Sequence, residues 1–111
     1  MERDDRLLRS LDQELQPYAA ALIQIIRGYQ PNVYITSSLR SGKEQLALYI
    51  RFKQGKSRYP AAAPGTSKHE AGLAFDLGNV DPRILAAAGR LWESWGGRWG
   101  GRFHDAIHFE G

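Results

Sequence analysis

The sequence predicts a small α+β domain in which a mainly antiparallel sheet packs against about three helices. Two patterns alternate along its 111 residues. In some stretches apolar side chains recur every three or four positions, as in amphipathic helices. In others they occupy every second position, as in half-buried strands. A chain of this length can bury one hydrophobic core, and neither a repeat nor a linker divides it. We therefore expect residues 1–111 to form a single domain.

The first predicted helix runs from about residue 5 to residue 27. Pro17 lies inside this stretch and predicts a bend, because proline has no N–H to donate and its ring crowds the preceding turn. Gly28 is a suitable end for the helix. The apolar positions that define the pattern are Leu8, Leu11, Leu15, Tyr18, Ala19, Leu22 and Ile26.

Two further helices have recognisable first turns. The helix predicted over residues 41–54 begins with Ser41 and Glu44, which have the spacing of a capping box. In that motif the two side chains satisfy free N–H groups of the first turn. The helix predicted over residues 83–95 follows Asp81 and Pro82, a favourable N-cap and first-turn pair.

Three short strands are predicted between and after the helices, over residues 33–36, residues 72–77 and around residues 107–109. In the middle strand the large side chains alternate with small ones, so one face is expected to point to the core. The opposite face is small apart from Asp76, which leaves open space beside that carboxylate. The alternating residues are Leu73, Phe75 and Leu77 on one face and Gly72, Ala74 and Asp76 on the other.

Residues 55–66 are rich in Gly, Pro, Ser and Ala and have no periodicity. They are predicted to form a long loop. Loops of about a dozen residues in a small domain are often functional, which favours a flap that faces a substrate. A surface connection without such a role is the alternative.

Composition excludes several classes of protein. The chain has no cysteine, so disulfides and thiolate metal sites are excluded and any metal must bind nitrogen and oxygen ligands. A hydrophobic content of 42% with 24% charged residues argues against disorder. No apolar run approaches the roughly 20 residues that span a bilayer, and the charged N-terminus does not resemble a signal peptide. We therefore expect a monomer that is made in the cytoplasm and has no membrane partner. The net charge of +3 is too small to predict an anionic partner.

Two stretches together predict a zinc site. His69 and Asp76 lie seven residues apart, and His108 follows Asp105 by three. Two imidazoles and one carboxylate fill three positions of a tetrahedral zinc and leave the fourth for water, as in catalytic sites. A helix rises about 10 Å over seven residues and a straight strand extends about 23 Å, so the chain must turn between His69 and Asp76. Gly72 can permit that turn.

The spacing by itself also fits polar residues that only form hydrogen bonds, and both interpretations stay open at this point. The helical motif H-E-x-x-H is excluded, because Leu73 stands where its second histidine would be. His104 is a rival ligand, four residues before His108; we expect it to be a surface residue or, at most, to contact a ligand or the substrate. A spare carboxylate, Asp105, is suited to accept a proton from the metal's water.

The motifs resemble those of zinc peptidases related to D-Ala-D-Ala carboxypeptidases, and in particular the L-alanyl-D-glutamate endopeptidases of phage endolysins and bacterial autolysins. The resemblance covers about residues 33–110. It rests on Ser67-x-His69-x-x-Gly72-x-Ala74-x-Asp76, on Asp105-x-x-His108, on Ser37-x-x-Arg40 followed by Glu44-Gln45, and on the Trp-Gly-Gly stretch at residues 95–97. Ile107 departs from the proline that the family commonly has before its last histidine.

The resemblance implies a role for each motif residue. It implies that a Zn²⁺ cofactor binds His69, Asp76 and His108, and that Asp105 is the general base. Arg40 would hold a carboxylate or polarise the scissile carbonyl, as its planar, permanently charged group suits. The implied substrate-binding residues are Ser37, Gln45 and Ser67.

These expectations define a function and its alternatives. The first is a zinc-dependent peptidase that cleaves the stem peptide of peptidoglycan, with L-Ala–D-Glu as the expected bond and no separate wall-binding module. It would act on the wall after release in host lysis, or as a virion-associated enzyme. The alternatives are a D-Ala-D-Ala carboxypeptidase and a non-catalytic zinc module that binds the wall or a protein. A nucleic-acid binder, suggested by Trp92, Trp95 and Trp99, is disfavoured because these side chains are more simply explained as core.

Overall fold

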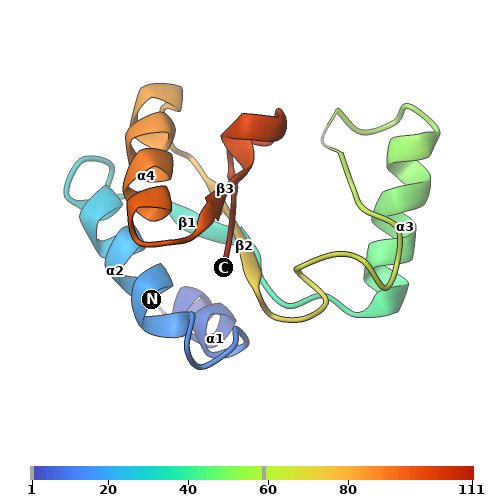
Figure 1. Ribbon diagram of the computed structural model, residues 1–111, viewed down its shortest axis with the longest axis horizontal. Helices are drawn as coiled ribbons and strands as arrows, with labels where there is room; N and C mark the ends of the chain where they lie inside the picture. Colours follow the sequence, from blue (N-terminus) through green and yellow to red (C-terminus); the bar gives the residue numbers. More distant parts are fainter. Residues whose placement is uncertain (1, 59) are drawn as a thin grey trace.

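A four-stranded antiparallel sheet lies at the centre of the molecule, with its strands in the order β1-β2-β4-β3 (Figure 1). The computed structural model describes residues 2–58 and 60–111; Tyr59, in the predicted loop, lies outside the described residues. The prediction of an α+β fold with an antiparallel sheet is confirmed. The helices are α1 (Glu2–Arg9), α2 (Gln16–Arg27), α3 (Gly42–Lys53) and α4 (Pro82–Ser94), with a 3-10 turn η1 (Gly100–Phe103), and the strands are β1 (Tyr34–Ser37), β2 (Ala74–Gly78), β3 (Arg98–Trp99) and β4 (His108–Glu110).

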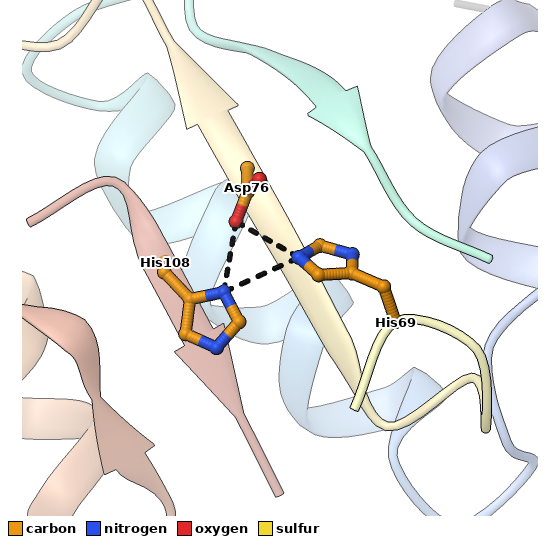
Figure 2. A group of neighbouring side chains, drawn as sticks. All are labelled: His69, Asp76 and His108. Atoms are coloured by element: carbon orange, nitrogen blue, oxygen red, sulfur yellow. Dashed lines mark hydrogen bonds and ion pairs between the residues drawn. The ribbon is translucent and has the colours of Figure 1, made fainter. Parts of the chain in front are cut away.

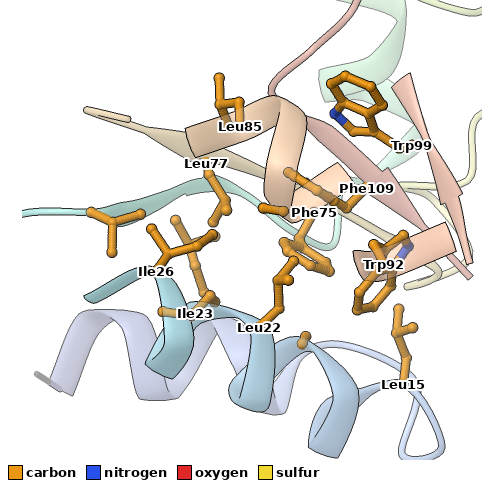
Figure 3. Close-up of a cluster of buried hydrophobic side chains, with 14 of the residues drawn as sticks. Leu15, Leu22, Ile23, Ile26, Phe75, Leu77, Leu85, Trp92, Trp99 and Phe109 are labelled. Carbon is orange, nitrogen blue, oxygen red and sulfur yellow. The ribbon is translucent and has the colours of Figure 1, made fainter. Parts of the chain in front are cut away.

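One face of the sheet packs on α2 and α4 to form the hydrophobic core (Figure 3). Phe75 of β2 and Phe109 of β4 are paired in register, and their rings stack with centroids 5.5 Å apart. The edge of the Trp92 ring meets Phe75 at 5.3 Å. Side chains alternate across a strand, so burying this row turns Asp76 and His108 to the opposite face. The sheet thus has one apolar face and one polar face.

The predicted single helix over residues 5–27 is wrong, because the chain forms two helices there. α1 ends at Arg9 and α2 begins at Gln16, which puts Pro17 in the first turn of α2. A first-turn N–H has no helical partner, so proline starts a helix there at no cost. Between the helices, the Gln16 amide donates to the carbonyl of Leu11, and the Leu11 side chain is buried in the core. Proline therefore starts α2 instead of bending one long helix.

The other predicted elements form with small shifts at their ends. The capping box of α3 is present, with the Ser41 hydroxyl accepting from Glu44 N–H and the Glu44 carboxylate accepting from Ser41 N–H. Asp81 caps α4. β1 begins one residue later than predicted, and β2 begins two residues later. The short β3 and η1 were not predicted, because two strand residues and a glycine-rich turn carry no periodicity.

α3 stands apart from the other helices, at the far end of the molecule from α1, α2 and α4 (Figure 1). The only buried residue of α3 is Gln45, and Leu46 and Ile50 are exposed. Trp92 and Trp99 are buried in the core, whereas Trp95 at the end of α4 is 37% exposed. None of the described helices is long and apolar enough to cross a membrane.

Candidate metal centre

Asp76 and His108 are brought together by the sheet itself. They are directly opposite each other in the antiparallel pair of β2 and β4, on the polar face. His69 comes from the turn that precedes β2, so the three side chains reach one point from two strands and a loop (Figure 2). All three are buried.

Gly72 makes the turn that the seven-residue spacing requires. Its φ is +72°, a left-handed conformation that side chains other than glycine rarely adopt. The turn is fixed to the body of the protein, because Asp12 N–H donates to the Gly72 carbonyl at 2.9 Å. The chain therefore reverses between His69 and Asp76, as their spacing predicts.

The three potential ligand atoms lie at the separations that a small cation needs. Nε2 of His69 is 3.2 Å from both Oδ1 of Asp76 and Nδ1 of His108, and the last two atoms are 3.0 Å apart. Ligands of a tetrahedral zinc with bonds of about 2.0–2.1 Å lie about 3.3 Å from one another. Nitrogen and oxygen donors in this number are a suitable zinc set, so the residues present fit the metal. Among the described residues, this is the one group of three or more potential ligands.

Hydrogen bonds of the outer ring nitrogens fix the tautomers of His69 and His108. Nδ1 of His69 donates to the Ser38 carbonyl at 2.8 Å. Nε2 of His108 donates to a carboxylate oxygen of Glu110 at 2.8 Å. In the neutral rings the inner nitrogens then carry lone pairs. In this state two nitrogen lone pairs and a carboxylate oxygen converge with no hydrogen between them. All three atoms are hydrogen-bond acceptors, so they cannot stabilise one another by hydrogen bonds, whereas a cation bound between them would stabilise all three.

Electrostatics in the metal-free chain are consistent with this arrangement. Without a metal, a proton on an inner imidazole nitrogen can be donated to Asp76. Burial would raise the pKa of Asp76, but such hydrogen bonds from His108 and His69, together with their positive charge, outweigh burial and hold that pKa well below its usual range. Burial would lower the pKa of His108, but the hydrogen bond and charge of Asp76, followed by Glu110, raise it. Both shifts have one cause, because the buried carboxylate of Asp76 favours positive charge at the cluster.

Arg40 is held at the edge of the cluster by three hydrogen bonds. Its Nη2 donates to Oδ2 of Asp76 at 3.1 Å, its Nε to Ser37 Oγ at 2.8 Å, and its Nη1 to Gln45 Oε1 at 3.2 Å. The Gln45 amide in turn donates to the Ala62 carbonyl. Ser37 and Gln45 therefore contact Arg40 in this structure, and their predicted substrate contacts stay a prediction.

A cavity of about 460 Å³ opens beside the cluster, and Asp105 is part of its wall. Asp105 is half-buried. Burial raises the pKa of its carboxyl, as does the negative charge of Asp76, while the positive charges of His108, His69 and Arg40 oppose the rise. A carboxylate with a raised pKa beside a metal site is suited to accept a proton.

The loop over residues 55–66 contributes to the wall of the same cavity through Ser57, Pro60, Ala61, Ala62 and Thr66. Ser67 also lines the cavity, and its hydroxyl accepts from His69 N–H. Both carboxylate oxygens of Glu70 accept from Gly65 N–H, so Glu70 holds the loop. His104 is exposed, at the end of η1, and lies outside the described lining.

Glu110 is a residue of the site that the sequence analysis missed. It is buried, and its carboxylate orients the His108 ring. Carboxylates that accept from a ligand histidine fix its tautomer and increase its basicity. The available signal was the two-residue spacing, which puts both side chains on one face of β4.

Comparison with known proteins identifies the family. The model of the VanY D-alanyl-D-alanine carboxypeptidase family matches residues 8–102, most of the chain. The chain belongs to the VanY family. The match ends before Asp105 and His108, so their position beside His69 and Asp76 comes from the structure. No curated protein matches at a significant level.

Solved structures share the fold of this VanY-family chain. One is the vancomycin resistance D,D-dipeptidase VanXYg in complex with a D-Ala-D-Ala phosphinate analogue, with a TM-score of 0.68 and 22% identity over 90% of this chain. This chain spans only 49% of VanXYg. Another is a mutant of the D,D-pentapeptidase VanY from a VanB-type resistance cassette, in complex with Zn(II). It has a TM-score of 0.68 and 18% identity, and the alignment covers 90% of this chain and 71% of the VanY chain. The L-Ala D-Glu endopeptidase ChiX of Serratia marcescens has a TM-score of 0.60 and 23% identity, over 97% of this chain and 85% of its own.

Proposed function

We propose that this chain is a zinc-dependent peptidase that hydrolyses a bond in the stem peptide of peptidoglycan. The observation that carries the proposal is the convergence of two imidazole lone pairs and one carboxylate oxygen within 3.0–3.2 Å of one another. Membership of the VanY family and the Zn(II) in a VanY structure of the same fold support zinc as the metal. The cavity beside the cluster provides space for a peptide.

In this proposal each residue of the site has a defined task. His69, Asp76 and His108 hold the ion, which supplies Lewis acidity and lowers the pKa of water toward 7. Asp105 accepts a proton from the attacking water and delivers it to the leaving amine. Arg40 donates to the oxygen of the scissile carbonyl as it gains negative charge. The three hydrogen bonds that it makes leave two of its five N–H groups for this purpose.

The L-Ala–D-Glu bond is the first candidate for cleavage. Supporting it is the likeness to ChiX, which this chain covers more completely than it covers the vancomycin resistance enzymes. The D-Ala-D-Ala bond is the second candidate, and the family's own description favours it. A non-catalytic zinc module would need neither Asp105 nor Arg40 at the cavity, which argues against that alternative.

Defined stem peptides test the function and the bond together. The protein is incubated with zinc and with peptides that contain both candidate bonds, and the fragments are identified by mass spectrometry. We expect cleavage at one bond, its loss with a chelator and its return with added zinc. His108→Ala should bind no zinc at the cluster and cleave nothing. A protein that binds zinc at this cluster but leaves every peptide intact would be a binding module instead.

The expected role in host lysis is a further part of the proposal. Added to chloroform-treated bacteria, whose wall is accessible, the wild-type protein should clear the suspension and His108→Ala should not. If peptides are cleaved while intact walls resist, the enzyme would act on released fragments.

A further inference from the structure

Arg98 occupies the polar face of the sheet, next to the metal cluster. In the pairing of β3 with β4 it lies opposite Glu110, while its neighbour Trp99 lies opposite Phe109 in the core. Because side chains alternate along a strand, Arg98 shares the face of Glu110 and His108. It also contributes to the wall of the cavity that contains the cluster.

An aromatic ring holds the Arg98 guanidinium at this wall. The guanidinium carbon lies 4.7 Å from the centroid of the Phe103 ring, within the range of a cation–π contact. The Phe103 ring in turn meets the His108 ring edge-on, with centroids 6.0 Å apart. The permanent positive charge of Arg98 is therefore separated from His108, a proposed zinc ligand, by the Phe103 ring.

The hydrogen-bond donors of Arg98 make no bond to a carboxylate, unlike those of Arg40 at the cavity and of Arg102 in the same segment of the chain. Arg40 is bonded to Asp76, and Arg102 makes two bonds to Glu93. Within residues 2–58 and 60–111, no carboxylate oxygen lies within 4.0 Å of an Arg98 nitrogen. A guanidinium with this freedom can bind an incoming carboxylate through two parallel hydrogen bonds.

A positively charged group at this wall would favour an acidic substrate. Asp105 and Glu110 line the cavity beside the proposed ligands, and their carboxylates would oppose a substrate carboxylate placed next to them. Peptides of the proposed substrate class carry carboxylates close to both candidate bonds: the C-terminal carboxylate of D-Ala-D-Ala, and the free carboxylate of D-Glu.

We propose that Arg98 is a specificity-determining residue that anchors a substrate carboxylate next to the scissile bond. The inference rests on the proposed function. Arg40 is less available to bind a substrate carboxylate, because three of its N–H groups already donate to protein groups. We therefore assign carboxylate recognition to Arg98. Charge-assisted hydrogen bonds of this kind change affinity by about 10- to 100-fold.

Matched peptide pairs test the anchor. Each candidate bond is presented in two forms, one with the neighbouring carboxylate free and one with it converted to the carboxamide. The wild-type protein should prefer the acid by about 10- to 100-fold in kcat/KM, mainly through KM. Arg98→Gln should lose this preference, so that its kcat/KM for the acid falls to about that for the amide. The pair of peptides that shows the effect identifies which carboxylate is bound.

Two control variants make the assignment specific. Arg102→Gln removes an exposed arginine of the same segment that is paired with Glu93, and should keep the full preference for the acid. Lys68→Gln removes the other unpaired cation of the described lining. If Lys68→Gln abolishes the preference while Arg98→Gln keeps it, the anchor is Lys68 and the proposal is overturned.

Binding measured by calorimetry separates this inference from the proposed function. The zinc-loaded protein is titrated with D-Ala-D-Ala and with L-Ala-D-Glu, each as the acid and as the amide. Acid-selective binding that is lost in Arg98→Gln supports the anchor even where no peptide is cleaved, in which case the proposed function alone fails. Equal binding of acid and amide by the wild type overturns the anchor, whether or not peptides are cleaved.

Discussion

Asp76 and His108 face each other across β2 and β4, and Oδ1 of Asp76 lies 3.0 Å from Nδ1 of His108. Two adjacent antiparallel strands therefore hold two of the three proposed ligands in register. Residues on a rigid sheet are positioned more accurately than residues on loops. Of the three proposed ligands, His69 alone depends on a turn for its placement.

Asp105→Asn should separate proton transfer from metal binding. Asp105 lines the cavity but is not part of the three-residue cluster, so the variant should keep one zinc per chain. An amide cannot accept the proton of the attacking water, and kcat should fall by about 10²- to 10⁴-fold. Zinc content by mass spectrometry and peptide cleavage at saturating substrate measure the two effects. Wild-type turnover in this variant would exclude Asp105 as the base.

Glu110→Gln should weaken metal binding without removing a ligand. The Glu110 carboxylate accepts from Nε2 of His108 and so keeps the proton off the nitrogen that faces the cluster. Loss of such an outer partner lowers metal affinity by about 10- to 100-fold. Competition with a chromogenic chelator measures the change. Glu93→Gln, which alters a carboxylate paired with Arg102 away from the cavity, is the control and should bind zinc like the wild type.

Zinc affinity should fall as the pH is lowered through the raised pKa of His108. A protonated imidazole cannot bind a metal, and the charge of Asp76 favours the protonated form in the metal-free chain. Because that pKa is raised, affinity is lost at a higher pH than an unperturbed histidine would cause. Asp76 does not add to this loss near neutral pH, since its own pKa is lowered. Titrations at several pH values should show a proton released on binding, and affinity that does not vary with pH would contradict the prediction.

Gly72→Ala should destabilise the protein and disturb the site. A left-handed conformation costs a residue with a side chain about 1–2 kcal/mol. The added Cβ would also lie 3.3 Å from the backbone oxygen of Ser10. Gly55 has nearly the same φ, +71°, with nothing within 4 Å of an added Cβ, so Gly55→Ala isolates the backbone cost. Denaturant unfolding should show the larger loss for Gly72→Ala, and only that variant should bind zinc more weakly, because its turn carries His69.

The sequence alone determined the main elements of the fold and the identity of the clustered residues. Capping at Ser41 and Asp81 and the alternation around Phe75 are local signals, so they could be read without a structure. The turn at Gly72 followed from the distance between zinc ligands, which the spacing of His69 and Asp76 must satisfy. The prediction of one helix bent at Pro17 is wrong because a proline that bends a helix and a proline that begins a helix have the same local sequence pattern.

The tertiary structure decided what depends on contacts between distant segments. Register between β2 and β4 places Asp76 opposite His108, and register between β3 and β4 brings Arg98 to the same face. The partners that fix the histidine tautomers also come from the folded chain: Ser38 lies 31 residues from His69, and Glu110 acts only once His108 faces the cluster. Strand pairing and side-chain hydrogen bonds over such separations leave no periodic trace in a sequence, because they are set by packing of the whole domain.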